Sequence, residues 1–224
     1  MSEREIAPYD KFVLTTSRKP SQRTRTFVRD LVRVIPWSFH FTRGSCSIKE
    51  LADELLSLGI NRLIIIYEKR GNPSLVKFYK LENAKLIEKD YKIRIKGITL
   101  ARELNRGRSI FTSESFLKVI NKCTSDFGEQ LYNMLSLFFN FERLRSIPII
   151  PNLKGIAIFF SDNNSLITLD FQQIETKEMI GPRIIISDVY LGKKGTAIQS
   201  LMNLLGLGQR KEKKLEKEIS DKSQ

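Results

Sequence analysis

The sequence has little of what most enzyme sites are built from. It holds one histidine and two cysteines in 224 residues, and Cys46 and Cys123 stand far apart with no CxxC pair. This argues against a zinc site and against a Ser-His-Asp triad, so we expect no metal and no cofactor. The one histidine, His40, lies in the aromatic run "WSFHF", where we expect it to be packed in a strand and not to act as a base.

Several longer signals are missing as well. No GxxxxGK[ST] motif is present to grip the phosphates of a nucleotide. The N-terminus "MSEREIAPYDKF" carries acids where a signal peptide would be basic and then apolar. No apolar run reaches the roughly 18 residues of a membrane span. We therefore expect a cytoplasmic protein that makes no membrane contact.

Positive charge is what the sequence has in excess. Lysine and arginine total 38 against 25 acidic residues, a net charge of +13, while 41% of the residues are hydrophobic and can form a core. Such a field attracts polyanions, and nucleic acid is the leading candidate. An anionic membrane surface, or charge that only keeps the protein in solution, are the alternatives.

The order of predicted elements indicates an α/β (α+β) protein with mixed, largely antiparallel sheets and packed helices, because strands occur in hairpins as well as across helices. Strands or hairpins are predicted over 11–16, 38–41, 61–81, 91–100, 155–171 and 182–191. Helices are predicted over 21–35, 47–58 with a capping box, 101–105, 113–140 with an interruption at 125–128, and 196–205. Each half has helices followed by a hairpin, which suggests a duplication joined near residues 83–90.

The first helix separates an apolar face from a cationic face. The apolar face would pack on a sheet, and its members are Phe27, Val28, Leu31, Val34 and Ile35. The opposite face carries three arginines at i, i+4 and i+8, namely Arg25, Arg29 and Arg33. Like charges at this spacing repel by about 0.2 to 0.5 kcal/mol per pair. The pattern therefore indicates a counter-charge from a partner, although a surface helix is usually polar outside.

The start of this helix carries cations, although acidic residues are favoured at the positive end of a helix dipole. Ser21 is well placed as an N-cap, yet cations surround the positive end of the helix dipole, namely Arg18, Lys19, Arg23 and Arg25. An anion docked at the helix start would reverse the sign of each of these interactions. Hydroxyls of Thr15, Thr16, Ser17 and Ser21 could donate hydrogen bonds to the same anion. We predict that this segment binds a phosphate backbone, the alternative being a merely basic surface.

A second basic row lies in "DYKIRIKGI". Strand alternation places Lys92, Arg94 and Lys96 on one face and Tyr91, Ile93 and Ile95 on the other. Cations about 6.6 to 6.8 Å apart could follow consecutive phosphates. An ordinary solvated strand face explains the row equally well.

One pattern fits a metal-dependent nuclease. Asp162 is followed, after twelve residues, by Glu175-Thr176-Lys177, in which two carboxylates could hold Mg²⁺ and the lysine could orient a water. Glu-x-Lys is common by chance in so charged a chain. Asp162 also precedes Asn163-Asn164, where turn formation explains an aspartate. The nuclease stays an alternative.

Three segments carry a family resemblance. "LTTSRKPSQRTRTFVRDL" resembles the opening signature of Brix-domain ribosome-biogenesis proteins, "MIGPRIIISDVYLGKKG" resembles the Gly-Pro-Arg strand that closes that domain, and "FGEQLYNML" lies in the matching helical position between them. The resemblance covers residues 11–195 and implies two similar halves, about 11–84 and 85–195, each similar to the anticodon-binding domain of some aminoacyl-tRNA synthetases. Residues 196–224 would form a C-terminal helix and charged tail.

The resemblance implies a non-catalytic factor of ribosome assembly that binds precursor rRNA through backbone phosphates. The chain looks like a compact archaeal member, similar to the subgroup associated with small-subunit rRNA processing. We expect it to act as a monomer. A protein-interaction scaffold is a further alternative, with ribosomal or assembly proteins as partners. The resemblance and the two basic patterns together give the candidate RNA-binding residues Ser17, Arg18, Lys19, Ser21, Arg23, Arg25, Arg29, Arg33, Lys92, Arg94, Lys96 and Arg183. Arg183 could equally serve as an internal salt-bridge partner.

Overall fold

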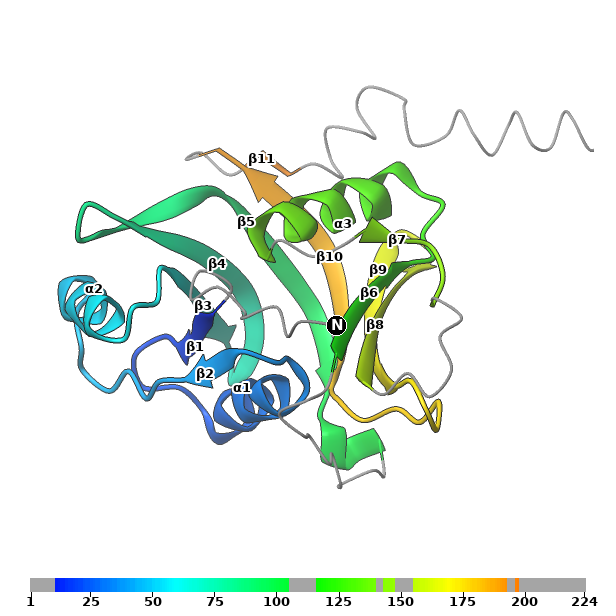
Figure 1. Cartoon of the computed structure of the whole chain (residues 1–224), viewed down its shortest axis with the longest axis horizontal. Helices are drawn as coiled ribbons and strands as arrows, with labels where there is room; N and C mark the ends of the chain where they lie inside the picture. Colours follow the sequence, from blue (N-terminus) through cyan, green and yellow to red (C-terminus); the bar gives the residue numbers. More distant parts are fainter. Residues whose placement is uncertain (1–10, 105–115, 140–142, 148–154, 193–195, 198–224) are drawn as a thin grey trace, which may run out of the picture.

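One continuous curved sheet organises the molecule. The computed structural model describes residues 11–104, 116–139, 143–147, 155–192 and 196–197 (Figure 1). Its eleven strands follow the order β2-β1-β3-β4-β5-β10-β9-β8-β6-β7, with β11 paired to β10. Most neighbouring strands are antiparallel. The predicted α/β class with a largely antiparallel sheet is confirmed.

Each part of the described chain begins with strands and helices in alternation and continues with consecutive strands. Up to residue 104 the elements are β1 (Phe12–Thr16), α1 (Gln22–Val34), β2 (Ser38–His40), α2 (Ile48–Ser57), β3 (Arg62–Lys69), β4 (Asn72–Glu82), β5 (Lys85–Thr99) and the 3-10 turn η2 (Ala101–Leu104). From residue 116 they are β6 (Phe116–Asn121), α3 (Asp126–Phe139), β7 (Arg143–Leu144), β8 (Gly155–Asn163), β9 (Leu166–Gln173), β10 (Arg183–Leu191) and β11 (Thr196–Ala197).

The strand pairing repeats. β1 has parallel neighbours on both sides, β2 and β3, and β6 likewise lies between parallel β7 and β8. Antiparallel steps then lead through β3, β4 and β5 on one side and through β8, β9 and β10 on the other, and β5 pairs with β10 at the centre of the sheet. The expected division at about residue 84 falls in the turn between the paired strands β4 and β5. We therefore propose the boundary between two similar halves after Thr99.

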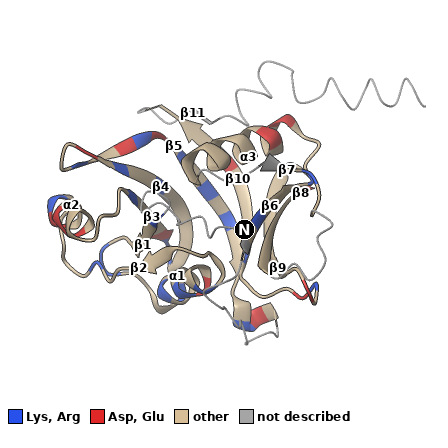
Figure 2. Cartoon of the chain, viewed as in Figure 1, with Lys and Arg blue, Asp and Glu red and all other residues tan. Residues whose placement is uncertain are grey.

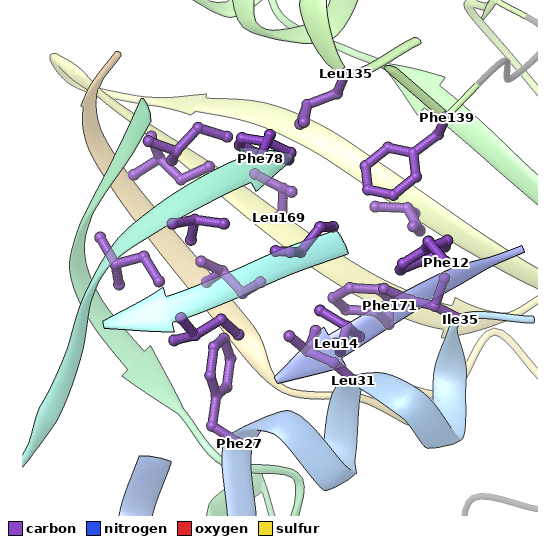
Figure 3. Close-up of a pocket in the computed structure, with 18 of the residues that line it drawn as sticks. Phe12, Leu14, Phe27, Leu31, Ile35, Phe78, Leu135, Phe139, Leu169 and Phe171 are labelled. Atoms are coloured by element: carbon purple, nitrogen blue, oxygen red, sulfur yellow. The ribbon is translucent and has the colours of Figure 1, made fainter. Parts of the chain in front are cut away.

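The two faces of the sheet are covered by different helices. α1 and α3 pack on one face, where they enclose the larger core. α2 packs on the opposite face, over Val13, Leu63 and Ile65. Between α1 and α3 the strands surround an apolar cavity of about 110 Å³, with Phe27, Leu31 and Ile35 on one side and Leu135 and Phe139 on the other (Figure 3). This shared core holds α1 firmly against the sheet.

The first two helices form as their sequences indicate. Ser21 caps α1 by accepting a hydrogen bond from the Thr24 amide, and the predicted apolar positions are buried except Ile35, which is partly buried. At α2, Ser47 and Glu50 form the predicted capping box. The short helical turn after β5 and the hairpins at Gly71 and Asn164 are also confirmed.

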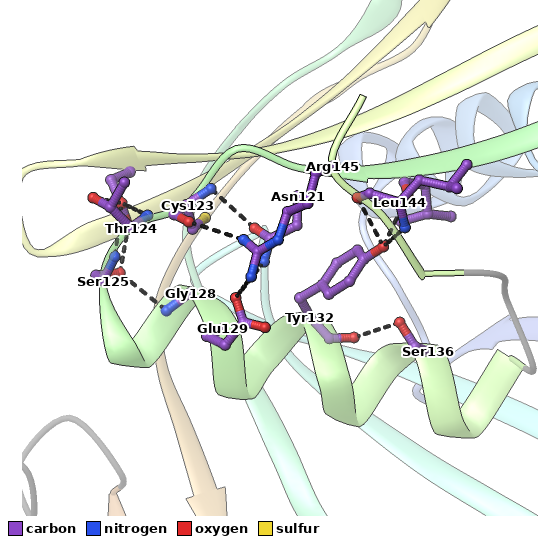
Figure 4. Close-up of polar contacts among 12 residues, drawn as sticks. Asn121, Cys123, Thr124, Ser125, Gly128, Glu129, Tyr132, Ser136, Leu144 and Arg145 are labelled. Atoms are coloured by element: carbon purple, nitrogen blue, oxygen red, sulfur yellow. Dashed lines mark hydrogen bonds and ion pairs between the residues drawn. The ribbon is translucent and has the colours of Figure 1, made fainter. Parts of the chain in front are cut away.

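α3 is attached to the sheet by polar groups within the segment "FGEQLYNML" (Figure 4). The buried Tyr132 hydroxyl accepts from the Leu144 amide at 2.7 Å and donates to the Val119 carbonyl at 3.0 Å. Glu129 pairs with Arg145 at 2.7 Å and accepts from the Asn121 amide group. These contacts tie the helix to β6 and β7, so the segment has a structural role.

The prediction of one long helix over 113–140 is wrong at its N-terminal end. Residues 116–121 form strand β6, and the helix begins only after Ser125, at the place expected to be an interruption. Val119 and Ile120 are both buried because the two faces of β6 are covered. A strand buried on both faces reads as a continuous apolar run, which periodicity cannot distinguish from a buried helix.

Two further expectations differ from the structure. Thr196 and Ala197 form β11, so the predicted helix over 196–205 does not begin there, and 198–224 lie outside the described residues. His40 is exposed on the edge strand β2 instead of packed. Partial desolvation of its ring and the charge of the nearby Arg29 lower the pKa of His40. Among the helices that the structure describes, none is long and apolar enough to cross a membrane.

Candidate RNA interface

The positive end of α1 already has an acidic partner inside the protein. The Glu68 carboxylate accepts hydrogen bonds from the Ser21 amide at 2.7 Å and from the Thr24 hydroxyl at 2.8 Å. Burial alone would raise the pKa of Glu68, but these donors and the charge of Arg25 lower it. Some of the counter-charge that the sequence led us to expect at this helix start is thus supplied by β3.

Two of the four hydroxyls expected to contact phosphate, those of Thr15 and Ser21, are engaged within the fold. The Ser21 hydroxyl donates to the Gly71 carbonyl at 2.8 Å, and the Thr15 hydroxyl donates to the Phe41 carbonyl at 2.7 Å. The Ser17 amide donates to the Ile66 carbonyl, with Ser17 itself partly exposed. Ser21 therefore joins α1 to the β3–β4 turn, a role that the sequence pattern did not reveal.

Arg23 also has a structural role. It forms an ion pair with Glu103 of η2 and donates to the Ile98 carbonyl of β5 at 3.1 Å. A second hydrogen bond joins η2 to α1, since the Ala101 amide donates to the buried Asp30 at 3.0 Å. The helix and the turn that follows β5 are therefore fixed together.

Three arginines of α1 lie on its outer face. Arg25, Arg29 and Arg33 are exposed, and their spacing places them on the side of the helix opposite to the buried Phe27. Figure 2 shows Lys and Arg segments in blue on α1. The Arg33 side chain is 65% exposed and lies 3.8 Å from Asp30, so one acid partly relieves the repulsion at this end of the row. A helix places residues i and i+8 about 12 Å apart along its axis. The row could follow a short stretch of phosphate backbone.

Arg18 and Lys19 extend this cationic surface beyond the helix start. Both are exposed in the loop between β1 and α1. Lys19 has a φ of 52°, a left-handed conformation that bends the loop before Pro20. The loop and the arginine row thus lie at one end and along one side of the same helix.

The β5 row has the predicted alternation, and two of its members have intramolecular partners. Ile93 and Ile95 are buried on the core side, while Arg94 and Lys96 are exposed. Lys92 lies 3.5 Å from Glu88, and Arg94 donates to the Tyr190 hydroxyl at 2.7 Å. Lys96 carries its charge at the surface, next to Arg94 along the strand.

Arg183 forms an internal salt bridge, which was the alternative to RNA binding for this residue. Its guanidinium donates two hydrogen bonds to Asp170, at 2.6 and 3.0 Å, which links β10 to β9. The hydrogen bonds to Asp170 raise the pKa of Arg183. In the Gly-Pro-Arg segment, therefore, the arginine stabilises the sheet.

Sequence reasoning missed two cations at the tip of the β3–β4 hairpin. Lys69 and Arg70 are exposed directly before Gly71, whose carbonyl accepts from Ser21. The hairpin tip thus lies beside the start of α1 and brings these charges near the loop of Arg18. The signal was present as a basic pair preceding the turn residues Gly71-Asn72-Pro73.

Asp162 of the nuclease alternative stabilises the start of α3. Its carboxylate accepts from the amides of Thr124 and Ser125, at 2.6 and 3.0 Å, and from both hydroxyls. Ser125 in turn caps the helix by accepting from the Gly128 amide at 3.0 Å. Glu175 and Lys177 are exposed in the turn after β9. The described residues contain no group of three or more His, Cys, Asp or Glu side chains arranged to hold a metal ion.

We expect Asp162→Ala to lower the free energy of unfolding by about 1 to 2 kcal/mol, because several donors lose their acceptor. Burial alone would raise the pKa of Asp162, but hydrogen bonds from Ser125 and Thr124 lower it. The carboxylate therefore stabilises the fold above its unfolded pKa, and this stabilisation is lost as the pH falls below about 3.9 toward the folded pKa. Urea unfolding of both proteins between pH 7 and pH 2 should show the difference shrink. A constant difference would contradict this role.

The comparisons with known proteins agree with the fold. No family model matches the chain. Three curated relatives carry the name "Probable Brix domain-containing ribosomal biogenesis protein". The protein of Aeropyrum pernix is 42% identical over 94 residues, which are 42% of this chain and 52% of that protein. The protein of Pyrococcus horikoshii is 40% identical over 92 residues, 41% of each. The protein of Methanococcus maripaludis is 36% identical over 179 residues, 79% of this chain and 96% of that protein.

Two crystal structures are similar as well. A probable ribosomal biogenesis protein from Aeropyrum pernix K1 superimposes with a TM-score of 0.68 and 26% identity over 80% of this chain and 95% of its own. An archaeal Imp4-like protein has the same fold, with a TM-score of 0.59 and 20% identity over 81% of this chain and 99% of its own. The matches to the first two relatives span about half or less of those proteins, whereas the Methanococcus match spans nearly all of its relative. The chain belongs to the Brix-domain ribosomal biogenesis family.

Proposed function

We propose that this protein is a non-catalytic assembly factor of ribosome biogenesis that binds precursor rRNA through backbone phosphates. The observation that carries the proposal is the exposed row of Arg25, Arg29 and Arg33 on α1, which the loop of Arg18 and Lys19 extends. A net charge of +13 adds long-range attraction for RNA. The relatives named as ribosomal biogenesis proteins support the same role.

The geometry favours phosphate contacts over base reading. Long arginine side chains on a convex helix face reach an RNA backbone readily, and such contacts carry no sequence information. Specificity would then come from RNA shape. The proposal includes action as a monomer in the cytoplasm, with ribosomal or assembly proteins as further partners.

Crosslinking of the protein to RNA in cells, followed by sequencing, tests this function. We expect crosslinks to concentrate at defined positions of precursor rRNA. A profile spread in proportion to RNA abundance would instead favour a general basic protein. Incubation of the purified protein with RNA and Mg²⁺ tests the catalytic alternative, and we expect the RNA to remain intact. Cleavage that is lost in Asp162→Asn would replace the proposal with the nuclease.

A further inference from the structure

The sheet splits where the β3–β4 hairpin tip leaves β5. The ladder between β4 and β5 ends at the pair Leu75–Arg94, and β5 continues to Thr99 paired only with β10. The tip residues 69–74 therefore diverge from the C-terminal end of β5. On the core side, α1 closes this split, since Ser21 bonds to Gly71 of the tip and Arg23 bonds to Ile98 of β5.

On the other side, the split remains open as a groove of about 760 Å³. We call it the tip groove. One wall is the hairpin tip, the floor is β5, and the other wall is β10. Its lining residues are Lys69, Arg70, Asn72, Pro73, Ser74, Arg94, Ile95, Lys96, Ser187 and Asp188. Four of these are cations and one is an acid, so the groove attracts anions.

The cations of the tip groove come from two elements, the hairpin tip and β5. Lys69 and Arg70 come from the tip, and Arg94 and Lys96 come from β5. Arg94 is held in place by the Tyr190 hydroxyl at 2.7 Å, and its guanidinium lies 5.9 Å from the centre of the Tyr190 ring. Because its position is fixed before a ligand arrives, Arg94 loses less side-chain entropy on binding. Asp188, the one acid, accepts from the neighbouring Val189 amide.

We infer that the tip groove binds a single-stranded segment of RNA, an inference that rests on the proposed function and names its second contact. An RNA chain has one phosphate charge per nucleotide, and the cations of the tip wall and of the β5 floor can contact successive phosphates of one strand. A groove of about 760 Å³ between a hairpin tip and its neighbouring strand suits a flexible single strand better than a rigid duplex, whereas the outer face of α1 is open to either form. The groove lies on the face of the sheet opposite to the α1 arginine row, and only its tip wall reaches the start of that helix.

Two double variants test the inference in the full-length protein, Lys69→Ser with Arg70→Ser and Arg94→Ser with Lys96→Ser. Binding is measured by fluorescence anisotropy with an unpaired RNA oligonucleotide and with a duplex of the same sequence. For each variant we expect the slope of log affinity against log salt to decrease by about 1.4 units with the single strand. With the duplex the slope should stay unchanged. Lys49→Ser with Lys85→Ser removes the same charge elsewhere and should leave both slopes as they are.

Tyr190→Phe provides a gentler test. It keeps the aromatic ring and removes the hydroxyl that holds Arg94, so affinity for the single strand should fall by less than in Arg94→Ser with Lys96→Ser.

Equal losses for duplex and single strand in the groove variants would overturn the inference, because they would indicate that the groove cations act only through the overall charge of the protein. Groove-dependent binding of a polyglutamate peptide, with unchanged RNA binding, would also overturn it in favour of an acidic protein partner. If the wild-type protein bound neither RNA, the proposed function itself would fail.

Discussion

Replacing Arg25, Arg29 and Arg33 together by serine should reduce the slope of log affinity against log salt by about 2 to 3 units. Each phosphate neutralised by a cation releases condensed counterions and contributes about 0.7 to 0.9 to this slope. The three side chains are exposed, so their loss leaves the buried face of α1 intact. Anisotropy titrations between about 50 and 200 mM salt measure the slope over the range where phosphate contacts matter most.

A matched triple variant separates this row from net charge. Lys49, Lys80 and Lys85 lie on α2 and near the far turn of the β4–β5 hairpin, away from the outer face of α1. Their replacement by serine removes the same three charges. We expect the slope of this control to stay close to that of the wild type. Equal slopes in the two triple variants would show that the α1 row is not a phosphate contact, even if the protein binds RNA.

Gly181→Ala should lower the free energy of unfolding by about 1 to 3 kcal/mol, as overpacking of a filled core does. A Cβ atom at this position would lie 2.7 Å from Cβ of Phe171 and 3.1 Å from a methyl carbon of Val34. Both neighbours are fully buried, and the contact atom of Phe171 is next to the backbone, so rotation of its ring cannot make room. Gly181 therefore lets the segment before β10 approach β9 and α1 closely.

Gly97→Ala is the matched control for this change. Gly97 lies in the central pair of strands β5 and β10, and a Cβ atom there would have nothing within 4 Å. We expect the free energy of unfolding of Gly97→Ala, measured by urea unfolding, to remain close to that of the wild type. Gly128→Ala should resemble Gly181→Ala, since its Cβ would lie 2.4 Å from Cβ of Cys123. Similar stability of all three variants would mean that the close approaches at Gly181 and Gly128 relax without cost.

The three family segments differ in what their residues do. In the opening segment, Ser21 and Arg23 join α1 to the sheet, while Arg25 and Arg29 point outward. A sequence pattern shows which residues stand together along the chain but gives no indication of which bonds they make. Side-chain partners distant in sequence, such as Glu68 and Glu103, decide between structural and surface roles. For this reason the candidate RNA-binding residues included residues with internal hydrogen bonds as well as residues exposed at the surface.

Local sequence patterns by themselves determined several helices and turns of this protein. The 3.6-residue period of α1, its N-cap at Ser21 and the capping box of α2 depend on neighbours within a few residues, so the sequence predicts them correctly. The exposure of Arg25, Arg29 and Arg33 follows from the same period. The turn chemistry at Gly71 and Asn164 likewise predicts the hairpins.

Only the tertiary structure decided what depends on contacts between distant segments. Strand β6 is buried on both faces, with Val119 in the larger core and Ile120 in a separate cluster, so its apolar run is the same as that of a buried helix, and only its pairing with β7 and β8 identifies it as a strand. The counter-charge at α1 comes from Glu68, 47 residues after Ser21. The tip groove exists because β4 pairs with β5 only from Leu75 onward, and this is fixed by the strand register and not by local propensity. Charge on an exposed helix face is a local property, whereas the shape of a binding groove is set by long-range pairing.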